Sequence, residues 1–387
     1  MRAKASVLLA CFIISMLPAE ARAEVKLNAS CSKLNDVVSI KKQVFNCRNT
    51  TVGPKWKLLF SNRKINSYEK TKLIAYSEIQ TALEKDMSKN IELKYWVSKY
   101  FPKELEKQYK SQVELTNKLM GSFFTKPEVV NIYLYTEKDS EFLNSYPIFS
   151  NSWDLKDRER WFGEWAKGIG RQHNLGLAAF YSEYPSGTWQ GHAGLIVHSS
   201  ATPRSLRRYA IQVMPHEYFH VAQDYYFRTK WEDFLREKGK LNLNGMDVYD
   251  SYFPPIFREG SANTISFAIA SQTPESYLSL YKYFIDEKKQ QTEINLFAKL
   301  KTVKSTQETL SSMEFRRKNS QAHEASYSMG QLVFEWLIAE YGFDAYRKLI
   351  VNQLVGNDFE DNLKESVGLT LPELYAKAAP HLIAAFK

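Results

Sequence analysis

Hydrophobic residues recur at helical spacing over residues 68–89 and 91–120, with charged residues at the intervening positions. This spacing gathers the apolar side chains on one face and predicts two amphipathic helices. Pro102 interrupts the second stretch, because proline lacks the amide donor that a helix interior needs. The apolar positions that carry the prediction are Leu73, Tyr76, Ile79 and Leu83, followed by Leu105, Tyr109 and Val113.

From residue 127 the pattern changes to short runs of β-branched and aromatic residues. Val129–Thr136 reads VVNIYLYT and predicts a buried strand. Residues 176–181 and 192–199 predict two more strands, and the sequence Pro185-Ser186-Gly187 between them is typical of a turn.

The rest of the chain is expected to be mainly helical. A helix should begin near Pro203 and end near Phe227, with a kink at Pro215. Another helix opens at residues 257–263, and further helical segments are expected at residues 277–312, 327–349 and 359–386. Because strands come first and helices afterwards, the pattern favours an α+β domain.

The N-terminal residues resemble an export signal. Arg2 and Lys4 precede an apolar run, and Ala21-Arg22-Ala23 matches a cleavage site, so the mature chain is expected to begin at Glu24. Export would place Cys31 and Cys47 in an oxidising compartment, where one disulfide is the expected state and two free thiols are the alternative. The expected organisation is therefore a signal peptide over residues 1–23, a disulfide-containing and helical segment over residues 24–126, and a catalytic domain over residues 127–387.

Composition narrows the class of protein. The chain of 387 residues is 44% hydrophobic and 25% charged, as in ordinary globular proteins. Its net charge of +9 falls to about +7 without the signal, but lysine is interleaved with glutamate and no nucleic-acid-reading module is present, so nucleic acid is not an expected partner. Anionic surfaces and acidic substrates remain open as partners, and no segment after the signal is apolar enough for a membrane span.

The chemistry is expected at His216-Glu217-Tyr218-Phe219-His220, which has the pattern H-E-x-x-H. On a helix, His216 and His220 lie on one face and can offer two imidazole nitrogens to one metal ion. Glu217, beside them, can act as a general base without being a ligand. The alternative is an amphipathic helix with histidines on its polar face. Two imidazoles leave a metal half coordinated, so the motif requires a third ligand elsewhere.

Together with Glu259-Gly260-Ser261-Ala262, the motif resembles the gluzincin metallopeptidases, which combine H-E-x-x-H with E-G-x-A on a later helix. The resemblance implies a thermolysin-like zincin domain that binds one Zn²⁺ through His216, His220 and Glu259. A match to the family's Y-x-x-G at Tyr327-Ser328-Met329-Gly330 implies that Tyr327 supports the oxyanion. In this family a zinc-bound water, activated by the residue corresponding to Glu217, attacks the peptide carbonyl. The strand at residues 192–199 would be the substrate-binding edge strand.

The chain departs from the family in ways that bear on specificity. It lacks the G-x-M-E-N stretch that holds a substrate's free amine in aminopeptidases, so endopeptidase activity on a peptide or protein is favoured. The 38 residues between His220 and Glu259 indicate an insertion beside the cleft. The rival functions are a catalytically silent binding protein with this fold and a non-peptidase zinc hydrolase at the same site.

Several other polar residues are secondary candidates. Asn263 and Gln223 are placed to contact the ligating histidines, and His323 is the alternative to Tyr327 as oxyanion partner. The remaining histidines lack partnered spacing and are interpreted as ordinary polar residues: His173, His192, His198 and His381.

Overall fold

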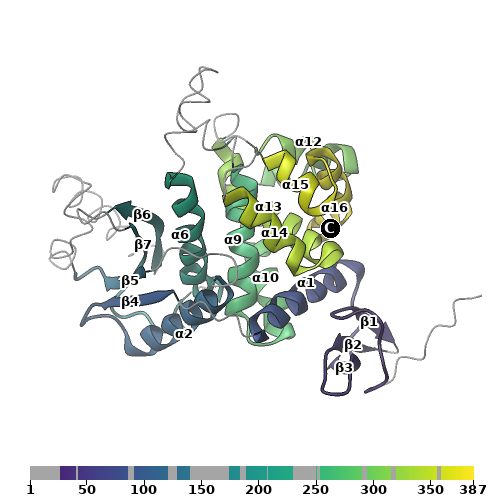
Figure 1. Cartoon of the computed structure of the whole chain (residues 1–387), viewed down its shortest axis with the longest axis horizontal. Helices are drawn as coiled ribbons and strands as arrows, with labels where there is room; N and C mark the ends of the chain where they lie inside the picture. Colours follow the sequence, from purple (N-terminus) through teal and green to yellow (C-terminus); the bar gives the residue numbers. More distant parts are fainter. Residues whose placement is uncertain are drawn as a thin grey trace, which may run out of the picture. The chain divides into compact units, whose positions relative to one another are not determined.

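The computed structural model divides into two compact units, Met1–Ile65 and Asn66–Lys387 (Figure 1). It describes residues 27–40, 42–85, 91–120, 129–139, 174–183, 189–206, 208–229, 250, 253–289, 294–314, 320–354 and 359–387. The predicted signal peptide lies outside these residues. No helix among them is long and apolar enough to cross a membrane.

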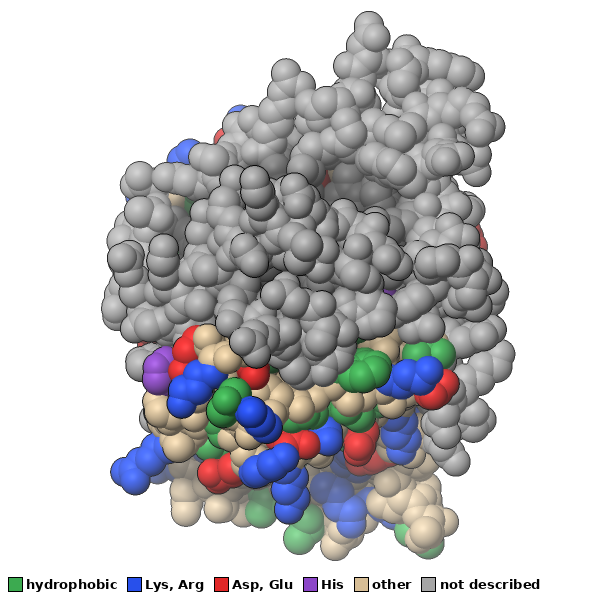
Figure 2. Space-filling view, turned by 90° about the vertical axis from the view of Figure 1, so that its left-hand side faces the viewer, with side chains coloured by type: hydrophobic (Ala, Val, Ile, Leu, Met, Phe, Trp, Pro, Cys, Tyr) green, Lys and Arg blue, Asp and Glu red, His purple; other side chains and the backbone are tan. Residues whose placement is uncertain are grey.

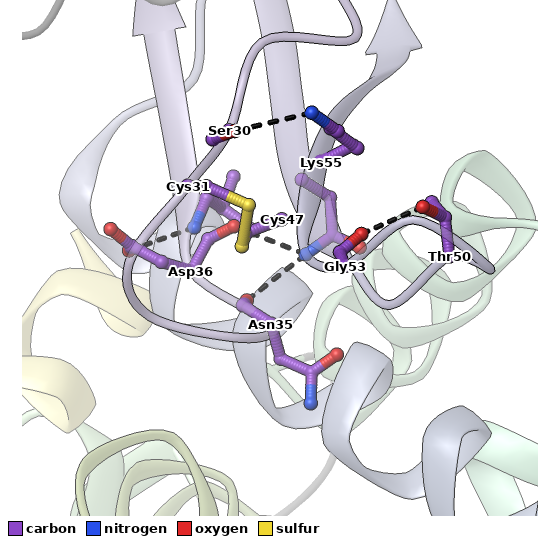
Figure 3. The surroundings of a disulfide bond; sticks show 10 residues. Ser30, Cys31, Asn35, Asp36, Cys47, Thr50, Gly53 and Lys55 are labelled. Carbon is purple, nitrogen blue, oxygen red and sulfur yellow. Dashed lines mark hydrogen bonds between the residues drawn. A yellow bond between two sulfur atoms is a disulfide. The ribbon is translucent and has the colours of Figure 1, made fainter.

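The first unit contains a small antiparallel sheet closed by a disulfide. Its strands are β1 (Val37–Ile40), β2 (Gln43–Arg48) and β3 (Lys55–Phe60), in that order across the sheet. The Cys31–Cys47 disulfide, predicted from the sequence, ties the segment before β1 to β2 (Figure 3). Next to this bond, Phe45 and Trp56 form a small core. A core this small needs a covalent staple, which explains why the two cysteines lie here.

The second unit contains a four-stranded mixed sheet in the order β4-β5-β7-β6. Strands β4 (Glu92–Val97), β5 (Val129–Thr136) and β7 (Trp189–Val197) run parallel, and β6 (Asn174–Glu183) pairs with β7 in the antiparallel sense. The three strands predicted from the sequence are confirmed. The prediction that residues 192–199 form an edge strand is wrong, because β7 has neighbours on both sides and β6 is the antiparallel edge.

Strand β4 was not expected, because its residues were assigned to a helix. Burial alternates along it, with Leu93, Tyr95 and Val97 packed against the core and the intervening residues more exposed. A period of two is the signature of a half-buried strand, and over six residues it was hidden within a longer helical pattern. Because α2 connects the parallel strands β4 and β5, residues 91–120 belong to the same compact unit as the later strands. The unit begins at Asn66, so the predicted boundary after residue 126 does not coincide with the division into compact units.

Helices form the larger part of the second unit, so its architecture is mixed, in agreement with the predicted α+β class. The thermolysin-like arrangement of that class stays a prediction. In chain order the helices are α1 (Ser67–Glu84), α2 (Lys103–Met120), a 3₁₀ turn (Arg208–Gln212), α6 (Val213–Thr229), α9 (Pro255–Ala270), α10 (Pro274–Lys289), α11 (Ile294–Phe297), α12 (Val303–Ser311), α13 (Ser320–Tyr341), α14 (Phe343–Leu354), α15 (Phe359–Val367) and α16 (Leu371–Phe386).

Helix α9 lies at the centre of this unit, and every one of its side chains is buried. Helix α6 packs between the sheet and α9, and α13 packs along the other side of α9 (Figure 1). The sheet, α6, α9 and α13 therefore follow one another as layers. Acidic and basic side chains are interspersed on the face shown in Figure 2. On α2, Glu106 pairs with Lys103 and Lys110.

Several helix boundaries differ from the sequence prediction. The stretch predicted as helical over residues 277–312 is divided among α10, α11 and α12, and the stretch over residues 359–386 is divided between α15 and α16. Two further differences have local reasons. The helix with the metal motif begins at Val213 rather than near Pro203, so Pro215 is its third residue. The first amides of a helix have no intrahelical acceptor, and a proline there is tolerated without a kink. The helix predicted over residues 327–349 is divided at Gly342, whose positive φ of 84° ends α13.

Candidate metal centre

Helix α6 presents His216 and His220 on one face near its N-terminal end. Their Nε2 atoms are 2.9 Å apart, and the two rings are nearly perpendicular, at 88°. Both nitrogens therefore face the same point from successive turns, as the spacing of four residues predicted.

Helix α9 supplies the third group. Oε2 of Glu259 lies 3.1 Å from Nε2 of His220 and 3.4 Å from Nε2 of His216. Ligands bound at 2.0–2.1 Å around a tetrahedral ion are about 3.3 Å from one another. The three atoms thus have the separation that a shared ion requires, and the group could hold a metal.

The electrostatics of the group depend on its burial. Burial lowers the pKa of His216 to about 4, and the neighbouring charge of His220 adds to this effect. Burial also acts to lower the pKa of His220, but the carboxylate of Glu259 outweighs it, so that pKa is raised. Burial opposes ionisation of Glu259, yet His220 and Arg258 hold its pKa well below the usual range. At neutral pH the group therefore contains an ionised Glu259 carboxylate and a neutral His216 imidazole, and both can coordinate a cation.

Gln223 orients the second histidine. Its Oε1 lies 2.5 Å from Nδ1 of His220, and its Nε2 donates to Oγ of Ser261 at 2.9 Å and to the carbonyl oxygen of Arg258 at 3.2 Å. Since its amide nitrogen is engaged as a donor, its oxygen accepts a hydrogen bond from Nδ1–H of His220. The lone pair of Nε2 is then directed toward His216 and Glu259, the tautomer that metal binding needs.

Arg258 fixes the orientation of Glu259. Its Nε donates to Oε1 of Glu259 at 3.1 Å, which leaves Oε2 directed toward the histidines. The side chain of Asp250, fully buried, lies 4.0 Å from the guanidinium group. Arg258 was not among the predicted site residues, although its position directly before the predicted ligand Glu259 was a usable signal.

Tyr327 and Glu217, the two predicted catalytic residues, both lie beside the group. The ring of Tyr327 stacks on the ring of His216, with centroids 5.6 Å apart. The charge of Glu217 contributes to the raised pKa of His220. Asn263 connects α9 with α13, because its Nδ2 donates to the carbonyl oxygen of Tyr327 at 3.0 Å. The structure thus brings together residues from α6, α9 and α13.

The other histidines are not part of this group where the structure describes them. His192 is buried on β7 near the hydroxyl of Tyr133, and His198 contacts Ser200. His381 is buried beside Glu335. The side chain of His323 and the whole of His173 lie outside the described residues, as do residues 230–249 of the predicted insertion.

The resemblance to gluzincins rests on the three sequence motifs, and membership of that family stays a prediction. No protein-family model, curated protein or solved structure matches this chain.

Proposed function

We propose that this chain is an exported zinc metallopeptidase of the gluzincin type, and an endopeptidase rather than an aminopeptidase. The observation that carries the proposal is the convergence of His216 Nε2, His220 Nε2 and Glu259 Oε2 within bonding distance of one ion. A general-base candidate, Glu217, lies on the same helix beside them.

The donor set supports zinc among the possible metals. Two neutral imidazoles and one carboxylate form a three-ligand set of the kind found in zinc hydrolases, which leaves a further position for water or substrate. When bound, Zn²⁺ would supply Lewis acidity and bring the pKa of a coordinated water to about 7. Gln223 and Arg258 would keep the ligand atoms oriented.

Glu217 carries the proton transfers in this proposal. Its side chain is only partly buried, so it can contact solvent and substrate, and its charge faces the same centre. It would accept a proton from the attacking water and return it to the leaving amine. A carboxylate suits this work because it can be ionised before the attack and protonated after it.

Tyr327 would act on the carbonyl oxygen of the scissile bond. Its ring is held against His216, and its backbone is held by Asn263. A phenol hydroxyl fixed in this way can donate a hydrogen bond as negative charge develops on that oxygen. The support for this role is the position of the ring together with the Y-x-x-G resemblance.

The decisive experiment measures cleavage of a mixed peptide library by the purified mature protein, with products identified by mass spectrometry. We expect internal cleavage, including in peptides with a blocked N-terminus, and loss of activity with a chelator that zinc restores. Glu217→Gln should abolish cleavage, whereas Glu340→Gln, at an exposed position on α13, should retain it. Cleavage that persists in Glu217→Gln would overturn the mechanism, and hydrolysis of esters without peptides would favour the non-peptidase alternative.

A further inference from the structure

The net positive charge of the chain is concentrated in the first unit. Residues 27–65 contain eight Lys or Arg and one Asp, so they carry a net charge of +7. Residues 66–387 contain 40 basic and 40 acidic residues and are neutral overall. Basic residues in the second unit are interspersed with acidic ones, as on α2. Residues 27–65 therefore carry an excess of positive charge that residues 66–387 lack, and they are called the cationic module below.

Lysines of the cationic module point into solvent. Lys33, Lys57 and Lys64 are exposed. Where lysines of β3 make hydrogen bonds, the acceptors are neutral: Lys55 donates to Oγ of Ser30 and Lys57 donates to Oδ1 of Asn28 (Figure 3 shows the first). These bonds hold the side chains without cancelling their charge. Such a surface attracts a polyanion at physiological ionic strength.

Two basic residues at the end of the β2–β3 hairpin add to the positive charge of the module. Arg48 and Lys55 are directly opposite each other in the antiparallel register. Like charges in that relation oppose strand pairing. An anion bound at this end would relieve the repulsion.

Exposed apolar side chains accompany the charges. Val52, in the turn between β2 and β3, is 76% exposed, and Leu27, before the segment that pairs with β3, is 55% exposed. Leu34, Ile40 and Leu58 are also exposed. The three aromatic residues of the module, Phe45, Trp56 and Phe60, are instead buried. The module therefore exposes both aliphatic side chains and lysines, and it has no exposed ring.

We propose that the cationic module binds the surface of an anionic phospholipid bilayer. Lysines near such a surface each contribute favourably, and aliphatic side chains can enter the boundary between headgroups and acyl chains. A soluble polyanion could pair with the lysines, but it has no apolar interior in which Val52 and Leu27 could be buried. Nucleic acids and sugars are commonly bound by stacking on exposed aromatic rings, and the module buries all of its rings. This inference does not depend on the proposed peptidase activity.

The test is co-sedimentation of the full mature chain with vesicles of phosphatidylcholine containing 30% phosphatidylglycerol, compared with pure phosphatidylcholine. We expect binding to the anionic vesicles alone, and loss of binding as salt is raised. The triple variant Lys33→Gln, Lys57→Gln, Lys64→Gln should weaken binding on the order of 100-fold, since each charge contributes about fivefold. The matched control changes three exposed lysines of the second unit, Lys301→Gln, Lys304→Gln and Lys377→Gln, and should change binding less than about threefold.

A separate variant distinguishes a bilayer from a soluble polyanion. Val52→Ser should weaken vesicle binding about fivefold or more while leaving retention on a heparin column unchanged, because only the bilayer accepts the side chain. Equal losses in the two triple variants would show that total charge, not the module, drives binding, and would overturn the proposal. Undiminished vesicle binding by Val52→Ser would also overturn it, in favour of a soluble polyanion. An intact Cys31–Cys47 disulfide, checked by unreduced mass analysis, confirms that each variant is folded in this unit.

Discussion

Gly260 of α9 and Gly330 of α13 face each other with no room for a β-carbon at either position. A β-carbon on Gly330 would lie 1.9 Å from the carbonyl oxygen of Ile256, and one on Gly260 would lie 2.3 Å from the carbonyl carbon of Gly330. The two helices are therefore in backbone contact directly beside Glu259 and three residues from Tyr327. This contact gives a physical reason for the glycines of E-G-x-A and Y-x-x-G: they set the distance between the third ligand and the tyrosine.

Gly330→Ala should destabilise the protein and weaken metal binding together. The added methyl group must push α13 away from α9, and such overpacking typically costs about 1–3 kcal/mol. Thermal unfolding and a metal-binding titration would measure the two effects. Glu340→Ala, a change at an exposed position of the same helix, is the control and should shift the unfolding free energy by less than about 0.5 kcal/mol. A Gly330→Ala variant with normal stability would mean that the helices are farther apart than described.

Glu259→Gln should lower the metal content of the purified protein well below one ion per chain. The substitution keeps the shape of the side chain but removes the negative charge that both histidines and the ion face. Metal analysis after dialysis provides the measurement. Glu217→Gln should retain its metal, because Glu217 is assigned to proton transfer and not to coordination. Full metal content in Glu259→Gln would remove this residue from the coordination sphere.

Gln223→Leu should weaken metal affinity by about 10- to 100-fold, the usual cost of losing the partner that orients a ligating histidine. Leucine cannot accept the hydrogen bond from Nδ1–H of His220, so the tautomer that directs the Nε2 lone pair toward Glu259 and His216 loses its support. Gln223→Glu retains an acceptor at the same place and should bind metal much more tightly than Gln223→Leu. If the two variants have the same affinity, the hydrogen bond has no role in coordination.

Tyr327→Phe should reduce kcat by about 10²–10³ with little change in KM, folding or metal content. An oxyanion donor acts only when charge develops in the transition state, and the loss of one such donor has this size. The ring, which stacks on His216, is kept. His323→Ala is the comparison, because His323 was the alternative candidate. A large loss in His323→Ala beside a near-normal Tyr327→Phe would exchange the two roles.

Local patterns were sufficient to predict the elements that depend on neighbouring residues. The spacing of four residues placed His216 and His220 on one helical face, and the run VVNIYLYT gave β5 with its observed bounds. Glu259 was predicted only through a motif resemblance, because nothing in its own neighbourhood shows that it faces a helix 39 residues earlier.

Features that depend on contacts between distant segments could not be predicted. Strand β4 is a strand because it pairs with β5, although its residues continue a helical pattern. The place of β7 inside the sheet depends on β6, and that pairing leaves no mark on the sequence of β7. The meeting of Gly260 with Gly330 likewise requires the packing of two complete helices.

A buried ionic cluster ties α13, which carries Tyr327, to α1, α10 and α16. Nζ of Lys72 lies 2.5 Å from Oε1 of Glu335, and both side chains are fully buried. Tyr277 also donates to Oε1 of Glu335, and Nε2 of His381 lies 3.5 Å from its Oε2. Burial lowers the pKa of Lys72 to about 8, although Glu335 acts to raise it, so at neutral pH the pair contributes little net stability.

The same cluster should make the protein sensitive to acid. Burial acts to raise the pKa of Glu335, but Lys72 and His381 overcome this and lower it to about 2. Because the pKa of Glu335 is lower in the folded protein than in the unfolded one, ionised Glu335 stabilises the fold above pH 4.5. This contribution is lost as the pH falls toward 2. The loss should be about 3 kcal/mol of unfolding free energy, measured by urea denaturation across this range. The double variant Lys72→Met, Glu335→Gln keeps an acceptor for Tyr277 and removes both charges. Between pH 4.5 and pH 2 its unfolding free energy should therefore decrease by about 3 kcal/mol less than that of the unchanged protein. An identical acid dependence in the two proteins would show that other carboxylates account for the whole effect.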